Sequence, residues 1–303
     1  MAKALHDRQE TDRDLVALRA RATRIRRHIV EMLAEAASGH PGGSLSAVEI
    51  VTALYFGGFL RYDPKNPEWS DRDRFIISKG HGVPVLYAAL AEAGFLPHSE
   101  LKTLRKINSR LQGHPVLGTA PGIEASTGSL GQGLSIGLGM ALAARLDRKD
   151  TRVYVLLGDG ECQEGQIWEA AMAAGHHQPD NFIAIVDYNK FQLDGAIAEI
   201  IDLHPLAEKW RAFGWHVREI DGHDLGDVID ALDWSLANTG PSCIVAHTVK
   251  GKGVSFMEGE NAYHGVAPTE DELAKALGEL DGALHHAELS IERSAARDMR
   301  EGR

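Results

Sequence analysis

The sequence predicts an α/β fold, a doubly wound parallel sheet with helices on both faces. Val153–Leu157 and Phe182–Val186 are apolar throughout, as in strands that are buried on both faces of a parallel sheet. Gln166–Ala174, between them, has the Ala, Trp and Met content of a helix, and Gly175 is placed to end it. These segments form a βαβ unit, which places a ligand site at the carboxyl ends of its strands.

The other elements follow from the spacing of apolar residues. Leu15–Ala37 repeats them at helical spacing, and Ser46 with Glu49 forms a capping box for a helix over Ala47–Phe56. Further helices are expected from about Pro84 and at Ser99–Ile107, Gly131–Leu146 and Leu225–Ala237, and further strands at Phe75–Ser78, His216–Ile220 and Ser242–Val249. Residues 1–268 therefore form the domain, and residues 269–303 form a charged helical tail.

Composition limits the classes of function. The chain has 303 residues, 44% of them hydrophobic and 25% charged, as in an ordinary globular protein with one large α/β domain. Its net charge of −11 argues against nucleic acid or an anionic membrane as a partner, because both need a basic surface. The charged residues 1–14 do not form a secretory signal, and the cysteines form no close pair, so we expect a cytoplasmic protein.

Oxygen-bearing side chains follow both strands of the βαβ unit. Asp159 lies in Gly158-Asp159-Gly160, where the glycines allow a bulky anion to approach the backbone, and Asn189 follows the second strand. Mg²⁺ takes oxygen ligands, including carboxylates and substrate phosphates, and a loop carbonyl near Phe191 would supply a third protein oxygen. Gly-Asp-Gly alone is typical of a simple turn. Its position at a strand end favours a metal and diphosphate site.

Histidines and lysines occur in the other glycine-rich loops. His81 lies between two glycines after an expected strand, and Lys250 follows the last strand. His40 and His114 lie in Gly-His-Pro turns, and His264 precedes a glycine. Each could be a surface or capping residue, and the lysine could merely solvate its loop. Convergence at one sheet edge instead predicts a site for a diphosphate cofactor and a phosphorylated substrate.

Six motifs, in this order, resemble transketolase: SGHPGG, SKGHG, QGHP, TGSLGQG, LLGDGECQEG and IAIVDYNKFQLDG. The resemblance extends to about Pro268, whereas a whole transketolase is about twice as long. The chain therefore resembles the N-terminal, thiamine diphosphate-binding subunit of a split transketolase. This implies that residues 1–268 are a thiamine diphosphate-binding domain.

The resemblance also implies a reaction and a partner. Transketolases transfer a two-carbon ketol unit between a ketose phosphate and an aldose phosphate, with thiamine diphosphate and Mg²⁺, or another divalent cation such as Ca²⁺ or Mn²⁺. A separate C-terminal subunit would supply the glutamate that activates the aminopyrimidine, in an α2β2 heterotetramer. A pentose phosphate pathway substrate is the family default, and a specialised sugar remains open.

The resemblance assigns roles residue by residue. His40 lies beside the reacting carbon and His114 on the substrate side. His81 belongs to the diphosphate region, and His264 contacts the diphosphate and the substrate side. All four are the expected catalytic residues. The remaining cofactor-binding residues are Gly128, Leu130, Gly158, Asp159, Gly160, Glu164, Glu169, Asn189 and Lys250, and the metal ligands are Asp159, Asn189 and Phe191. Glu164 and Glu169 are expected in a carboxylate network at a subunit interface.

Two other interpretations remain open from the sequence. One is the α-subunit of a 2-oxo acid dehydrogenase, which also binds the diphosphate and a metal. The other is a non-catalytic, cofactor-binding subunit. The histidine set fits transketolase better than the former, and an intact metal and histidine set disfavours the latter.

Overall fold

A computed structural model describes the backbone of residues 13–301 and the side chains of residues 13–289. The expectation about residues 1–14 rests mostly on residues outside this range. The end of the expected tail, residues 302–303, also lies outside the described residues. No described helix is long and apolar enough to cross a membrane.

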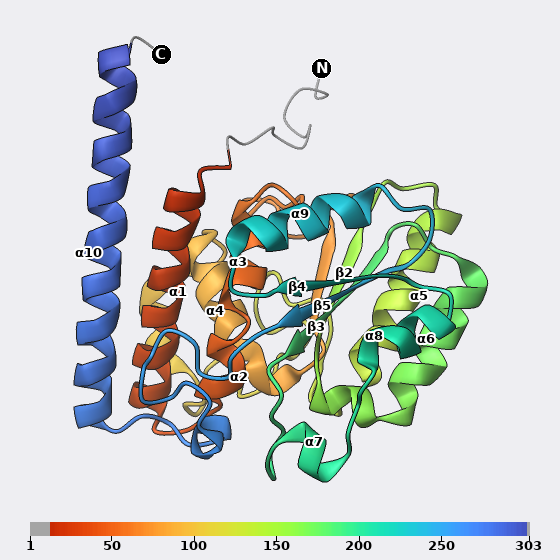
Figure 1. Ribbon diagram of the computed structural model, residues 1–303, viewed down its shortest axis with the longest axis horizontal. Coiled ribbons are helices and arrows are strands. Elements are labelled where there is room, and N and C mark those ends of the chain that lie inside the picture. The colour runs from red at the N-terminus through yellow and green to blue at the C-terminus, as the bar shows by residue number, and fades with distance from the viewer. Residues whose placement is uncertain (1–12, 302–303) are drawn as a thin grey trace.

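Five parallel strands form one sheet in the order β1-β2-β3-β5-β4 (Figure 1). They are β1 (Arg74–Ile77), β2 (Val153–Gly158), β3 (Phe182–Tyr188), β4 (His216–Asp221) and β5 (Ser242–His247). The register pairs Gly158 of β2 with Asp187 of β3, and Tyr188 of β3 with His247 of β5. The carboxyl ends of three adjacent strands therefore lie side by side.

Helices cover both faces of this sheet, as the apolar strands require (Figure 1). One face carries α1 (Leu15–Ala36), α3 (Val48–Phe56), α4 (Val83–Glu92) and α9 (Leu225–Leu236), and the other carries α5 (Gln132–Leu146), α6 (Gly165–His177) and α8 (Leu206–Ala212). Along β2, Tyr154 and Leu156 belong to the first core, whereas Val155 and Leu157 belong to the second. This alternation between two buried faces confirms the predicted fold class.

Short elements connect these layers, and most of them lie where strands end. They are α2 (Pro41–Leu45), η1 (Gly80–Gly82), η2 (His98–Thr103), η3 (Gly160–Gln163), α7 (Ile197–Ile200) and η4 (Asn261–His264). The predicted helix at Ser99–Ile107 is wrong in extent, because only the 3-10 helix η2 forms there.

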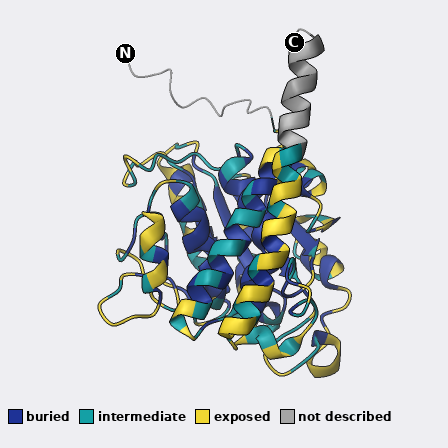
Figure 2. Cartoon of the chain, turned by 90° about the vertical axis from the view of Figure 1, so that its left-hand side faces the viewer, coloured by how far each residue is buried: buried dark blue, intermediate teal, exposed yellow. Residues whose placement is uncertain are grey.

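The last helix, α10 (Glu270–Glu301), runs beside α1 in the opposite direction (Figure 1). Ala276 and Leu280 are buried against the first core, while the outer face of α10 is exposed (Figure 2). Arg27 of α1 also forms an ion pair with Asp281. The expected tail is therefore helical, and its first half packs on the domain.

Two local predictions are wrong for the same physical reason, which is tertiary contact. Ser46 and Glu49 do not form a capping box: Ser46 donates to Asp187, and Glu49 accepts two hydrogen bonds from Arg26. Gly175 does not end α6. A Cβ there would lie 1.8 Å from the carbonyl oxygen of Phe213, so the glycine allows α6 to pass close to the chain after α8.

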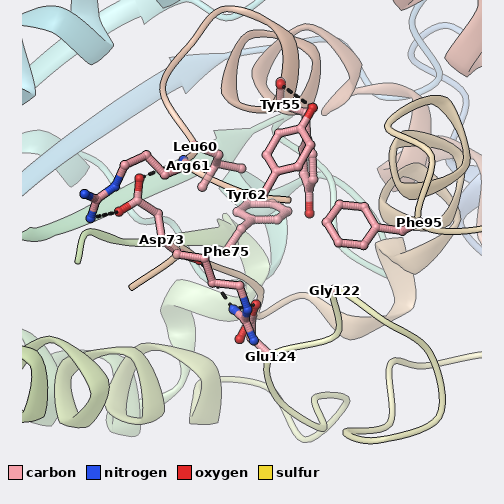
Figure 3. Close-up of a pocket in the computed structure, with 10 residues that line it drawn as sticks. Tyr55, Leu60, Arg61, Tyr62, Asp73, Phe75, Phe95, Gly122 and Glu124 are labelled. Carbon is pink, nitrogen blue, oxygen red and sulfur yellow. Dashed lines mark hydrogen bonds and ion pairs between the residues drawn. The ribbon is translucent and has the colours of Figure 1, made fainter. Parts of the chain in front are cut away.

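A small pocket lies at the amino end of the sheet, away from the strand ends described above (Figure 3). Aromatic rings line it, and Tyr62 donates a hydrogen bond to the carbonyl of Tyr55 at 3.0 Å. Arg72 pairs with Glu124 beside it. Since the charged groups are paired with each other, this pocket offers packing rather than reactive chemistry.

Candidate functional site

Four histidines from four loops meet at the carboxyl edge of the sheet. The His40 ring lies 5.2 Å from His81, 5.7 Å from His264 and 6.3 Å from His114, measured between ring centroids. The His81 and His264 rings stack at 5.4 Å. The structure thus brings together the histidines singled out in the sequence; their roles remain predictions.

These imidazoles are held in their neutral form. Burial, followed by the charge of Arg105, lowers the pKa of His40 to about 4, and burial with Lys250 lowers the pKa of His264 to about 4. Burial and Lys79 lower the pKa of His81 well below its usual range. A neutral imidazole presents one N–H donor and one nitrogen acceptor, so each ring can donate one hydrogen bond and accept another.

A glycine allows the loop before α5 to approach His114. Gly128 has a φ of +151°, and a Cβ there would lie 3.1 Å from Cδ2 of His114. Thr127 donates to the carbonyl of Ile77 at 2.7 Å and so ties this loop to the end of β1. Leu130 follows and is half-buried. Gly128, which the resemblance assigns to the cofactor, therefore lies next to the histidine cluster.

Asp159 and Asn189 end neighbouring strands and are joined through one loop. Asp159 is 2% exposed and Asn189 is 6% exposed. Asp159 accepts hydrogen bonds from the backbone N–H groups of Gly160 and Lys190, and Asn189 accepts one from Phe191 at 3.1 Å. The expected metal ligands are thus adjacent. The loop closes over Gly160, where a Cβ would lie 3.0 Å from Gln192.

Asp187, which precedes this loop, was not singled out in the sequence, although it is the most fully bonded carboxylate of the site. It forms an ion pair with Lys79, and both side chains are 1% exposed or less. Ser46, Thr248 and Asn189 also donate hydrogen bonds to it. Burial would raise the pKa of Asp187, but Lys79 and the hydroxyl donors lower it, so this group stays ionised. It joins four segments beneath the site.

Lys250 places a cation between the histidines and the metal-competent loop. Its Nζ lies 2.9 Å from His264 Nδ1 and 2.9 Å from Asn261 Oδ1, and the side chain is 1% exposed. Burial lowers its pKa to about 8. Lys250 therefore lies beside the histidine cluster, and its contact with a bound anion stays a prediction.

Among the glutamates after Asp159, Glu161 is buried. It accepts hydrogen bonds from Ser78, from the Gly131 N–H at 2.9 Å and from the Gly158 N–H at 3.0 Å. Its role is to hold these loops together, which the position in sequence did not reveal. Glu164 and Glu169 are exposed, and no hydrogen bond or ion pair joins them to another described side chain. The expected carboxylate network is therefore not formed within the described part of this chain.

The residues present fit a divalent cation and a diphosphate. Within residues 13–289, the buried Asp159 has no lysine, arginine or histidine in ion-pair contact, and a buried charge calls for a counter-ion. His40 Nδ1 and Gln192 Oε1 are buried without a hydrogen-bond partner among the described residues, which is expected of groups that face a ligand. Oxygen donors from Asp159, Asn189 and the Phe191 loop suit Mg²⁺.

Arg105, which the sequence did not single out, lies at the outer side of the histidine cluster. Its Nη1 donates to Ser38 at 3.0 Å, and a Cβ on Gly113 would lie 2.7 Å from its guanidinium. Its charge contributes to the lowered pKa values of both His40 and His114. In the described part of the chain no carboxylate pairs with it. No local signal in the sequence indicates it, because its contacts with the loops around Gly39 and Gly113 arise only in the fold.

Comparison with known proteins identifies the family. The chain matches the transketolase, thiamine diphosphate binding domain family over residues 18–298. It is 47% identical over 267 residues to the 6-deoxy-6-sulfo-D-fructose transketolase subunit SqwG of Clostridium sp., covering 88% of this chain and 97% of that protein. It is 42% identical to an apulose-4-phosphate transketolase subunit of Phocaeicola vulgatus, covering 87% of this chain and 93% of that protein.

Whole transketolases match only in part. Mouse transketolase is 44% identical over 257 residues, which is 83% of this chain but 40% of that protein. The crystal structure of the Campylobacter jejuni transketolase has a TM-score of 0.82 and 31% identity, and the match covers 93% of this chain and 47% of that chain. This chain belongs to the transketolase family of transferases as its N-terminal, thiamine diphosphate binding part, and it corresponds in extent to the N-terminal subunits of split transketolases.

Proposed function

We propose that this chain, together with a separate C-terminal subunit, transfers a two-carbon ketol unit from a ketose phosphate to an aldose phosphate. The observation that carries the proposal is the meeting of four neutral histidines beside a buried, metal-competent aspartate and asparagine. Thiamine diphosphate, when bound, supplies the stabilised carbanion that this chemistry needs. The protein residues bind, orient and move protons.

Asp159, Asn189 and the carbonyl near Phe191 would hold Mg²⁺, with Ca²⁺ or Mn²⁺ as substitutes, and Gly158 and Gly160 let the diphosphate approach. Lys250 and His81 lie where the negative charge of the diphosphate would be, and His264 is bonded to Lys250. An anion there would raise the pKa values of the nearby imidazoles from about 4 toward neutral pH, because it stabilises their charged form. The histidines would then exchange protons in both directions.

The charge of Arg105, at the outer side of the histidine cluster, supports an anionic class of substrate. Arg105, with no carboxylate partner among the described side chains, can bind the anionic end of a sugar through paired N–H donors. The relatives named above act on a sulfo-sugar and a sugar phosphate, which share an anionic terminal group. We propose a sugar phosphate as substrate. We expect a substrate of the pentose phosphate pathway, and a sulfonated sugar is the alternative substrate to compare with it.

The partner completes the site. In the proposed α2β2 heterotetramer, located in the cytoplasm, the C-terminal partner contributes the glutamate for the aminopyrimidine and an aromatic surface. The exposed Glu164 lies beside the loop before α5. A Cβ built on Gly131 of this loop would be 3.2 Å from the Cβ of Glu164. This position supports a carboxylate contact made across a subunit interface, which would include Glu169.

The test is an assay of the chain with the product of its neighbouring gene, using ketose phosphates, sulfonated ketoses and 2-oxo acids as donors. We expect ketol transfer only when both subunits are present. His40→Ala should lower kcat by roughly 10²- to 10⁴-fold, the usual loss for a proton-transfer residue, while the exposed His176→Ala should not. Unchanged turnover in His40→Ala would favour the non-catalytic alternative, and 2-oxo acid decarboxylation the dehydrogenase alternative.

A further inference from the structure

Three metal-competent side chains meet among α1, α4 and η2, outside the site described above. They are His28 of α1, Glu92 at the end of α4 and His98 at the start of η2. His28 Nε2 and His98 Nε2 lie 3.1 and 3.2 Å from the same oxygen, Oε1 of Glu92. The two imidazole rings are 4.9 Å apart, and the ligand atoms all lie within 4.8 Å of one another.

The spacing of these atoms matches a metal site. Tetrahedral zinc has bonds of about 2.1 Å to nitrogen and oxygen, which places its ligand atoms about 3.4 Å from each other. The two nitrogen–oxygen separations are therefore within a few tenths of an ångström of the required edge. The side chains of His28, Glu92 and His98 are 19%, 10% and 55% exposed, so a metal would be reached from solvent.

Neighbouring charges orient two of the three ligands. The other ring nitrogen of His28, Nδ1, lies 3.8 Å from Glu31, and the other oxygen of Glu92 lies 3.6 Å from Nε of Arg24. A carboxylate behind the second nitrogen is the usual support of a metal-bound histidine, since it fixes the tautomer and the ring orientation. These contacts occupy Nδ1 of His28 and Oε2 of Glu92, while Nε2 of His28 faces Oε1 of Glu92 at 3.1 Å.

We propose that His28, Glu92 and His98 form a second metal site, with Zn²⁺ as its preferred ion and water in the remaining position. Two imidazoles and one carboxylate are ligands that Zn²⁺ takes in open sites, whereas Mg²⁺ prefers oxygen alone. The site is thus chemically distinct from the oxygen-rich position at Asp159. The proposal stands on the geometry of these residues and does not depend on the proposed function.

The alternative occupant of this cluster is a proton. Burial lowers the pKa of His28, but hydrogen bonds to Glu31 and Glu92 outweigh it and raise the pKa to about 9. Zn²⁺ would take the place of the protons between each histidine and Glu92, since ligating histidines must be deprotonated at the bound nitrogen. Direct metal titration separates the two occupants.

A metal here would join η2 to α1 and α4. The segment that follows η2 carries Arg105 and then His114 to the histidine cluster. Zinc would therefore hold the start of the segment that supplies the outer side of the site.

The experiment is a titration of the chelator-treated, tag-free chain with Co²⁺ and then Zn²⁺, in the presence of Mg²⁺ and thiamine diphosphate. We expect a visible Co²⁺ absorption band from mixed nitrogen and oxygen ligands, lost when Zn²⁺ displaces Co²⁺. His98→Ala should weaken binding at least tenfold and Glu31→Gln about tenfold, the loss typical of a support behind a ligand. His176→Ala, which changes an exposed histidine elsewhere, should bind like the parent chain.

His98 is more than half exposed, so its replacement should leave the fold intact, and melting temperatures of all variants check this. Equal Zn²⁺ affinity in His98→Ala and the parent chain would overturn the proposal. The proposal would also be overturned if the parent chain did not bind Zn²⁺ stoichiometrically. His28, Glu92 and His98 would then form only hydrogen-bonded ion pairs.

Discussion

Two buried aspartates at the ends of neighbouring strands have opposite surroundings. Asp187, in β3, pairs with Lys79 and accepts hydrogen bonds from Ser46, Thr248 and Asn189. Among the described residues, Asp159, after β2, accepts only from the backbone N–H groups of Gly160 and Lys190. The pKa of Asp187 is lowered, while burial and the charge of Asp187 raise the pKa of Asp159 to about 7.

The difference shows how the same residue type serves two purposes. Both carboxylates are buried, so burial alone does not separate them. Asp187 has its cation built into the chain, and its interactions are complete. Asp159 has no cation partner among the described residues. A bound metal ion would balance the charge of this buried carboxylate. Asp187 therefore has a structural role, whereas metal binding by Asp159 stays a prediction.

The largest expected effect is the loss of stability when the ion pair between Lys79 and Asp187 is broken. Lys79→Met leaves the charge of Asp187 buried without a cation and should lower the free energy of unfolding by about 3–5 kcal/mol, measured by urea denaturation. Adding Asp187→Asn to this variant should recover part of the loss, because the orphaned charge is removed. A single variant as stable as the parent chain would remove the basis of the comparison.

For Asp159, the expected effect of a substitution is on Mg²⁺ binding rather than on stability. Asp159→Asn should lower Mg²⁺ affinity about 100-fold in the presence of thiamine diphosphate, since Asp159 is the one carboxylate among the expected ligands. The free energy of unfolding without Mg²⁺ should not fall, because the loss of a backbone hydrogen bond is offset by the removal of a buried charge that lacks a cation. Calorimetry measures the affinity, and Asp194→Asn, in the same loop but exposed, is the control. Equal Mg²⁺ affinity in both variants would refute the assignment.

The smallest expected effect concerns the buried groups that carry no charge. The pKa values of His40 and His264 are lowered to about 4, so between that pH and 6.5 the unfolded chain binds more protons than the folded one. Stability should therefore fall as the pH is lowered through this window. Urea midpoints measured from pH 7 downward should decline less steeply in His40→Gln. Identical slopes would show that folding does not lower the pKa of His40.

Much of the fold was predictable because it depends on short segments. β2 and β3 are apolar at nearly every position, so their burial on both faces was visible without knowledge of their neighbours. The glycine-rich loops at strand ends also placed Asp159, Asn189 and the histidines at one edge. Where prediction failed, as for Glu49 and Gly175, a distant residue decided the outcome: Arg26 for the first and Phe213 for the second.

The site was predictable only in part, for a related reason. Lys79 and Asp187 lie in two of the transketolase-like motifs, but nothing near either residue in the chain indicates that they pair. The exposed Arg105 likewise becomes notable only because the loops around Gly39 and Gly113 fold against it. Local sequence does not report a contact between residues that are far apart in the chain.

The sequence by itself therefore determined which segments are strands and helices and which chemical groups stand at strand ends, because apolar periodicity and glycine placement act locally. Tertiary structure alone decided the strand order β1-β2-β3-β5-β4, the pairing of Lys79 with Asp187 and the meeting of His28, Glu92 and His98. These depend on the packing of elements across two cores, where contact is set by the whole fold.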